Sequence, residues 1–134
     1  MKPRYFTPEE ATQLIPEVEK RLREVAIANE AVVSLKADLD GTLNGDARIL
    51  DFVETKQRLN KAMTDMHRAM ESLEYLGCTM KDLDHGLVDF PAMRFGEEVW
   101  LCWREGENKV SFWHGKGEGF DMRRPLEADV SGLA

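Results

Sequence analysis

The sequence predicts an α+β fold: a long antiparallel helical hairpin followed by a small antiparallel sheet of three to four strands. Apolar residues recur every three or four positions through residues 1–77, which is the spacing of one helix face. Residues 78–126 instead contain short β-rich segments separated by glycine-containing turns, and these predict the sheet and a C-terminal loop. The chain has 134 residues, the usual size of one domain, so we expect a single domain with a loose tail at residues 127–134.

The first helix has a strong start signal near the beginning of the chain. Thr7 can cap the helix, Pro8 suits its first position because that position needs no N–H donor, and Glu10 completes a capping box. Pro16 follows early in the helix, so we expect it to bend the helix or loosen its first turns. The apolar positions alternate steps of four and three residues, with Asn29 filling the one gap: Ala11, Ile15, Val18, Leu22, Val25 and Val32.

Residues 38–46 contain two glycines and four Asp or Asn residues, which predict a loop between the helices. Lys56 interrupts the apolar stripe of the second helix once, and Gly77 is placed to end that helix. The second stripe consists of Ile49, Phe52, Leu59, Met63, Met66, Met70 and Leu73.

A calcium site is one interpretation of the loop, because several residues there have EF-hand-like spacing. The motif requires a glutamate at its last position, which this chain lacks, so a plain turn is favoured over a calcium loop. The residues with that spacing are Asp40, Thr42, Asn44, Gly45 and Asp51.

The length of the hairpin predicts self-association. A helix of about 30 residues is about 45 Å long, whereas a strand of about 6 residues spans only about 20 Å. The sheet is therefore too short to cover the whole apolar stripe, and we expect a second copy to cover the remainder in a homodimer. Asn29 and Lys56 either set the register of this contact or lie at its edge. The predicted dimer seam consists of Val18, Leu22, Val25, Asn29, Leu59, Met63 and Met66.

Three segments have the character of strands: residues 86–90, 97–104 and 109–114. In the central strand, alternation places Val99, Leu101 and Trp103 on one face and Trp100 and Cys102 on the other. Both faces therefore carry large apolar groups. We expect helices to cover one face, and a ligand, the C-terminal tail or a second subunit to cover the other.

Composition excludes several classes of function. The formal net charge of -7 disfavours binding to nucleic acid or to anionic lipid, and no apolar run is long enough to cross a membrane. The first residues lack the apolar stretch of a secretory signal. Cys78 and Cys102 imply neither a disulfide framework nor a zinc knuckle, and we expect a cytoplasmic location.

The candidate site is a group of acidic residues and one histidine. Asp89 lies between Val88 and Phe90, where burial is expected, and a buried carboxylate needs a cation, a metal or several donors. Histidine with carboxylates is a competent ligand set for Zn, Mn, Fe or Ni. The proposed metal ligands are Asp89, His114 and Glu118, with Asp82 or Asp84 in support.

A purely structural interpretation has more weight than the metal. Asp89 can pair with Arg104, Arg123 or Arg124, and His114 can be a hydrogen-bonding residue at a strand end. Asp82 or Asp84 can cap a turn. The same three arginines form a weaker candidate site for a small anion.

Nucleophilic catalysis is disfavoured. Cys102 lies in an apolar strand interior, which raises a thiol pKa and makes it unreactive. The chain contains no phosphate loop, dinucleotide fingerprint or serine-hydrolase motif. The leading functional hypothesis is therefore a dimerising interaction or scaffold domain that contacts itself or another protein. The alternative is a metal-binding module or metal-dependent enzyme.

Several segments together resemble a known family. They are the opening residues 5–11, the segment 81–92, Cys102 to Arg104 with Gly106 and Glu107, Trp113 with His114, Gly119 with Phe120, and residues 124–126. In these segments the chain resembles the bacterial domain of unknown function 2203 family. The resemblance spans nearly the whole chain and implies one domain in a bacterial, intracellular setting, with no catalytic residues to carry over.

Overall fold

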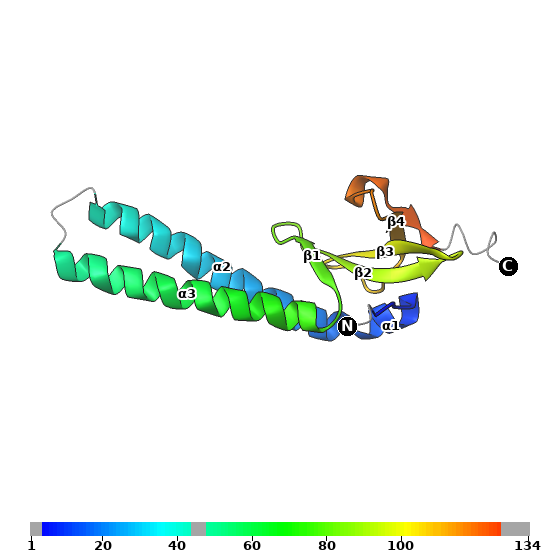
Figure 1. The fold of residues 1–134 in the computed structure, drawn as a ribbon, viewed down its shortest axis with the longest axis horizontal. Coiled ribbons are helices and arrows are strands. Elements are labelled where there is room, and N and C mark those ends of the chain that lie inside the picture. The colour runs from blue at the N-terminus through cyan, green and yellow to red at the C-terminus, as the bar shows by residue number, and fades with distance from the viewer. Residues whose placement is uncertain (1–3, 44–47, 127–134) are drawn as a thin grey trace. The chain divides into compact units, whose positions relative to one another are not determined.

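The computed structural model describes residues 4–43 and 48–126, and Figure 1 shows their arrangement. The described residues form two compact units: one contains those up to Glu19 and from Leu73 onward, and the other is Lys20–Ser72. The elements are α1 (Pro8–Gln13), α2 (Ile15–Leu43), α3 (Ile49–Tyr75), β1 (Thr79–Asp82), β2 (Leu87–Arg94), β3 (Glu97–Arg104), β4 (Phe112–Gly115), the 3-10 helix η1 (Phe120–Met122) and β5 (Arg124–Pro125). The predicted α+β fold is confirmed.

The N-terminal start signal forms the capping box that the sequence predicts. The backbone N–H of Glu10 donates to the Thr7 hydroxyl at 3.1 Å, and the backbone N–H of Thr7 donates to the Glu10 carboxylate at 2.9 Å. Leu14 then separates the two helices, because α1 ends at Gln13 and α2 begins at Ile15, although Leu14 keeps right-handed helical backbone angles. This break lies within the turn before Pro16, whose ring conflicts with that turn, and it accounts for the predicted disturbance.

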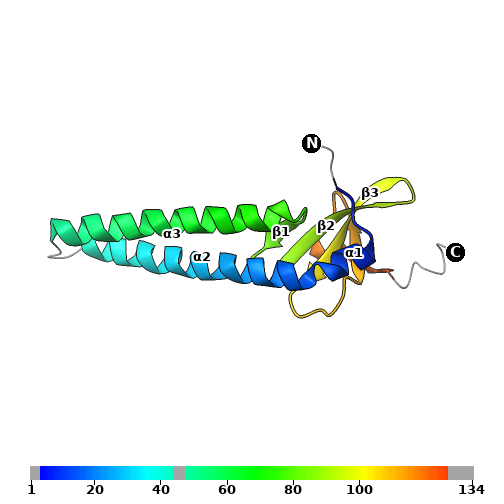
Figure 2. The same ribbon diagram turned by 90° about the horizontal axis from the view of Figure 1, so that it is seen from below.

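The helical hairpin is the core of the Lys20–Ser72 unit, where α2 and α3 lie side by side and antiparallel in both views (Figures 1 and 2). Its apolar centre consists of Val32, Leu59 and Ala62, all buried. The Arg21 guanidinium of α2 donates to the hydroxyl of Ser72 in α3. Four partly buried apolar residues pack against this centre: Ala31, Leu35, Leu39 and Met66.

The predicted loop over residues 38–46 is wrong at its beginning, because α2 continues to Leu43. Leu39 extends the apolar stripe and packs on the hairpin centre, and the Thr42 hydroxyl donates to the Leu39 carbonyl at 2.7 Å. The helix therefore tolerates Gly41. Two of the calcium candidates, Asp40 and Thr42, lie in this helix, Asp51 lies in α3, and residues 44 and 45 lie outside the described residues.

The residues of the predicted dimer seam differ in their exposure. Val18, Leu22 and Val25 are at most 2% exposed, and Leu59 is 7% exposed, so the chain itself covers them. Asn29 and Met66 are half-buried. Among the seven residues only Met63, at 48% exposed, offers substantial surface to a second copy. The seam itself stays a prediction.

The sheet is a five-stranded antiparallel meander in the order β1-β2-β3-β4-β5. The strands β1 and β5 extend the predicted three, and both are short. As predicted, Val99, Leu101 and Trp103 share one buried face of β3. The N-terminal segment covers this face: the Phe6 ring meets Phe90 edge to face at 5.4 Å, and the Phe6 N–H donates to a β2 carbonyl.

Candidate metal centre

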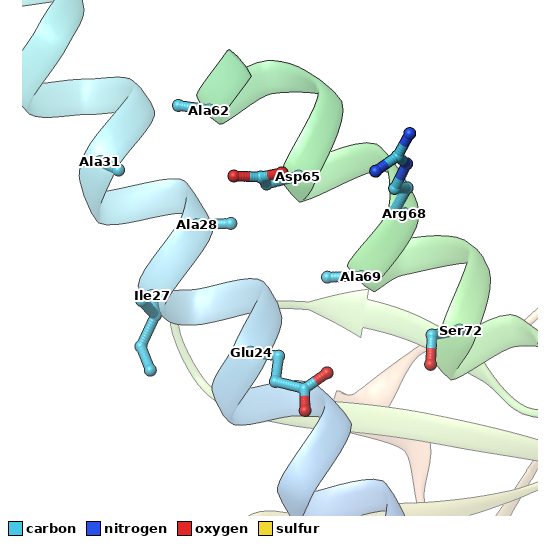
Figure 3. A pocket seen from close by; sticks show the side chains of 9 residues that line it. All are labelled: Glu24, Ile27, Ala28, Ala31, Ala62, Asp65, Arg68, Ala69 and Ser72. Carbon is cyan, nitrogen blue, oxygen red and sulfur yellow. The ribbon is translucent and has the colours of Figure 1, made fainter. Parts of the chain in front are cut away.

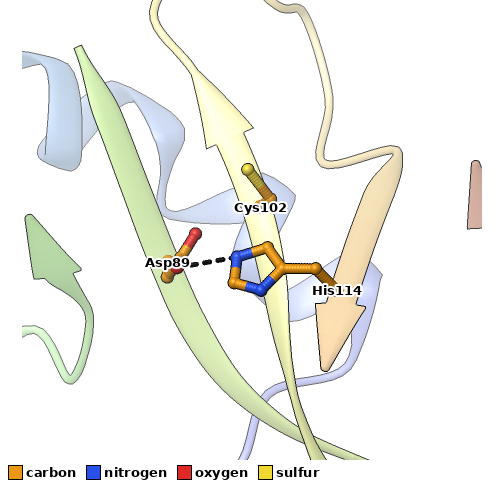
Figure 4. A group of neighbouring side chains, drawn as sticks. All are labelled: Asp89, Cys102 and His114. Atoms are coloured by element: carbon orange, nitrogen blue, oxygen red, sulfur yellow. Dashed lines mark hydrogen bonds and ion pairs between the residues drawn. The ribbon is translucent and has the colours of Figure 1, made fainter. Parts of the chain in front are cut away.

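Strand register brings three polar side chains together on the other face of the sheet. Asp89 of β2 pairs directly with Cys102 of β3, and Cys102 pairs with Phe112 of β4. Since side chains alternate along a strand, His114 lies on the same face as Phe112, two residues further on. Figure 4 shows His114 directed across β3 toward Asp89, with Cys102 between their strands.

These three residues form a compact and buried cluster, which we call the Asp–Cys–His cluster. One ligand atom from each of Asp89, Cys102 and His114 lies within 4.8 Å of the other two. The His114 Nε2 atom is 2.9 Å from Asp89 Oδ2, and each of the three residues is at most 2% exposed. Buried polar groups persist only when they are paired, and the Asp89–His114 contact provides the pairing.

The hydrogen bonds of His114 define where its protons lie. Its Nδ1 atom is 2.9 Å from the Gly115 carbonyl oxygen. A carbonyl only accepts, so Nδ1 carries a hydrogen. The Nε2 atom is therefore either protonated and facing an Asp89 carboxylate, or unprotonated and facing a protonated Asp89. In both cases one proton occupies the contact between Nε2 and Oδ2.

Burial governs the acidity of the other two members. It raises the pKa of Asp89, while the charges of His114 and then Lys81 act in the opposite direction. Burial also raises the pKa of the Cys102 thiol to about 12, and the Asp89 charge adds to this effect. Cys102 is therefore a neutral thiol near pH 7, in agreement with the prediction that it is a poor nucleophile.

A cavity of about 270 Å³ lies against the cluster, and all three of its residues form part of the wall. Leu87, Trp100 and Phe120 add apolar surface. Only a small part of each cluster residue faces this cavity, because each residue is at most 2% exposed. A metal held by three protein ligands beside a cavity would have an open fourth position.

Three of the predicted metal ligands do not join the cluster. Glu118 accepts from the Gly115 N–H at 2.8 Å and holds Arg124 through both carboxylate oxygens, at 3.0 and 2.9 Å. Asp82 accepts from the backbone N–H of His85 and pairs with its ring, which is the predicted turn cap. Asp84 is exposed. Local partners therefore account for Glu118 and Asp82.

The arginines also have partners other than the predicted ones. Arg123 pairs with Glu107 at 3.1 Å, and Arg124 pairs with Glu118. Arg104 lies 6.0 Å from the centre of the Phe120 ring. Asp89 pairs with His114 and not with an arginine. Carboxylates thus already pair with Arg123 and Arg124, and the anion site predicted from these arginines stays a prediction.

Cys102 is the member of the cluster that the sequence did not predict as a candidate ligand. The alternation along β3 placed Cys102 on the face opposite Leu101, but the pairing with β2 and β4 was needed to place it beside Asp89 and His114. A one-residue change of register would have turned Asp89 to the opposite face.

A second hollow lies in the Lys20–Ser72 unit, a groove of about 420 Å³ along α2 and α3. Figure 3 shows Ala28 of α2 and Ala69 of α3 pointing toward one another across it, with Asp65 between the helices. Ile27 and Arg68 contribute to its edges. Small side chains leave the groove open because they fill little of the space between the helices.

The fold and the cluster together define an α+β protein with a buried Asp–Cys–His site on an antiparallel sheet. The family described as "Uncharacterized conserved protein (DUF2203)" matches residues 4–126, and the chain belongs to this family. Among curated proteins and solved structures, none matches the chain. In the part of the chain that the structure describes, no helix is long and apolar enough to cross a membrane.

Proposed function

We propose that this chain is a metal-binding protein whose ligands are Asp89, Cys102 and His114. The observation that carries the proposal is the convergence of a carboxylate oxygen, a thiol sulfur and an imidazole nitrogen within 4.8 Å in a buried position. Bond lengths of about 2.0 to 2.3 Å place the ligand atoms of a tetrahedral zinc site about 3.3 to 3.8 Å apart. The cluster needs only small side-chain movements to reach that geometry.

The hydrogen bond from His114 to Gly115 supports this proposal. Metal-binding histidines generally donate their second N–H to a carboxylate or carbonyl, which fixes the ring and directs the other nitrogen to the metal. In this chain Nδ1 donates to the Gly115 carbonyl, and Nε2 faces the cluster. Loss of the proton shared with Asp89 would free both groups to bind a cation.

Zinc is the metal that best suits the three ligands. A thiolate, an imidazole and a carboxylate form a mixed set that borderline-soft ions favour. Three protein ligands leave a fourth position, and the cavity lies beside it. A bound zinc ion would polarise a substrate or lower the pKa of a bound water there. The thiol ligand has to stay reduced, so we also propose a cytoplasmic location.

Metal analysis of the untagged protein tests this proposal. We expect about one zinc per chain, and loss of zinc in the variants Cys102→Ser and His114→Ala. Cys78→Ser is the matched control, because Cys78 is the other buried cysteine and its sulfur lies 3.6 Å from the Leu73 carbonyl, outside the cluster. In cobalt-loaded protein, Cys102→Ser should also abolish the thiolate-to-metal absorption. Wild-type protein with no bound metal and no thermal shift on adding zinc would contradict the proposal.

Self-association through the helical hairpin is a second candidate function. The alanine-lined groove admits close approach of a helix, and Ile27 at its edge is 63% exposed. The groove also carries Glu24, Asp65 and Arg68, so it presents both charges, as a contact between two identical surfaces requires. We propose a second copy of the chain as its occupant.

The mass of the protein in solution tests the homodimer. We expect a dimer for the wild-type chain, and a monomer for Ile27→Lys, which places a charge at the groove. Val33→Lys is the control because Val33 lies on the same helix, is 60% exposed and does not line the groove. A stable wild-type monomer at micromolar concentration would exclude this contact, and a mixed complex with another protein would make that protein the occupant instead.

A further inference from the structure

Two lysines approach the same tryptophan at the cavity. The Nζ atom of Lys116 lies 3.8 Å from the centre of the Trp100 ring, and the Nζ atom of Lys81 lies 4.4 Å from it. Lys81 belongs to β1, and Lys116 follows β4. The fold therefore brings together two ammonium groups from distant parts of the sequence, and we call them the lysine pair.

The charges around the lysine pair do not balance it. Two carboxylates in the cavity wall have other partners: Asp82 pairs with His85, and Glu118 pairs with Arg124. Among the described residues, no carboxylate forms an ion pair with either lysine. Both ammonium groups line the same cavity, so an anion in the cavity would be attracted to each of them.

The same cavity wall holds the two ammonium groups of Lys81 and Lys116 and the carboxylates of Asp82 and Glu118. Arg124 neutralises Glu118, and Asp82 offsets about one of the two lysine charges, so the wall keeps an excess of about one positive charge beside the cluster. Lys81 acts on the cluster itself, because its charge lowers the pKa of Asp89.

We propose that the lysine pair binds the phosphate group of a small molecule in this cavity, whose wall also includes Trp100. This inference rests on the proposed function and deepens it by naming the class of ligand. The lysine pair would bind the phosphate group with or without metal, and a bound metal would add a second contact to the same ligand. A phosphate monoester carries about -1.5 to -2 charges near pH 7, which matches two ammonium groups better than one carboxylate does. Lysine binds phosphate as a point charge. It lacks the forked guanidinium with which arginine forms two parallel hydrogen bonds to one anionic group.

The cavity also limits the size of the ligand. Its volume of about 270 Å³ is at the small end for ligand sites, which suits a small metabolite. Leu87 and Phe120 line it with apolar surface for the organic part of such a molecule. The net charge of -7 disfavours a polyanion such as nucleic acid.

Titration with inorganic phosphate tests the lysine pair. The probe is the indole N–H signal of Trp100, assigned with Trp100→Phe and followed by NMR in the full-length, zinc-free protein. We expect Lys81→Gln and Lys116→Gln each to weaken phosphate binding about tenfold or more. Lys56→Gln is the matched control, since Lys56 also lies over an aromatic ring, 5.9 Å from the centre of Phe52 in the hairpin. That variant should bind phosphate as the wild-type protein does.

Three results would overturn the assignment. The first is that the wild-type protein shows no saturable phosphate binding. The second is that Lys56→Gln weakens phosphate binding as much as the cavity variants do, and the third is that acetate binds as tightly as phosphate, which would contradict selection of the ligand by its charge. Zinc content is measured separately on the same samples. Phosphate binding without zinc uptake contradicts only the metal site, and zinc uptake without phosphate binding contradicts only the lysine pair.

Discussion

Two aspartate–histidine pairs in the sheet unit have nearly the same geometry and very different surroundings. In the turn after β1, the ring nitrogen of His85 lies 2.8 Å from Asp82, and the two side chains are 64% and 38% exposed. In the cluster, the ring nitrogen of His114 lies 2.9 Å from Asp89, and both side chains are 3% exposed. The contact distance therefore does not distinguish the two pairs, whereas burial does.

Burial changes what each pair can do. Water surrounds the exposed pair, screens its charges and replaces either partner at little cost. The buried pair has no such replacement, so each partner depends on the other or on a metal. Among the residues that the structure describes, no third ligand joins the exposed pair, whereas the buried pair has Cys102 beside it. The same residue types thus form a turn cap in one place and a candidate metal centre in the other.

The largest expected effect is the dependence of zinc affinity on pH. Zinc has to displace two protons, one from the Cys102 thiol, whose pKa is about 12, and one from the contact between Asp89 and His114. Raising the pH removes this competition, so affinity should rise about a hundredfold per pH unit near neutrality. Cys102→Ser should no longer retain zinc through purification; for the weak affinity measured with added zinc, only one proton remains to be displaced, and the rise should be about tenfold per unit.

Calorimetry in buffers of different ionisation enthalpy measures the protons released per zinc. His85→Ala is the control, because it removes the exposed pair and leaves the cluster intact. Zinc affinity that does not change with pH would show that the metal binds elsewhere.

The second-largest expected effect is on the free energy of unfolding of the metal-free protein. His114→Ala leaves Asp89 buried without its partner, which should lower the free energy of unfolding by about 3 kcal/mol. His85→Ala should leave that free energy unchanged within error, since solvent takes the place of the lost ring. Denaturant titration of metal-free protein measures both. Equal losses in the two variants would mean that burial is not the property that separates the pairs.

Local sequence rules predicted much of the fold, because short-range chemistry determines those features. Thr7 and Glu10 form their capping box, and the alternation along β3 places Leu101 and Trp103 on one buried face. Apolar spacing also predicted the two long helices. The loop predicted from glycine and Asp or Asn content was wrong at the end of α2, where packing of Leu39 on the hairpin outweighs the helix-breaking tendency of Gly41.

The candidate site depends on long-range pairing, and this is why only part of it could be predicted. Asp89 stood out because a carboxylate between two apolar residues must have a partner. Its partner lies 25 residues away, and only the register of three strands places it there. The same register adds Cys102, whereas Glu118 satisfies its carboxylate locally through Arg124 and the Gly115 N–H.

The smallest expected effect is on the two carboxyl groups themselves, and it has opposite signs in the two pairs. Hydrogen bonds from His85 lower the pKa of Asp82 below its ordinary value of 3.8, so this group stabilises the fold above that value and loses its contribution as the pH falls. Burial raises the pKa of Asp89, so its contribution is complete below 3.8 and is lost as the pH rises through its folded-state pKa.

Carboxyl carbon NMR titration, with Asp82→Asn and Asp89→Asn to assign the signals, measures both shifts. If Asp89 titrated below Asp82, the pairing with His114 would outweigh burial. The cluster would then be a stable ion pair, which a metal would have difficulty displacing.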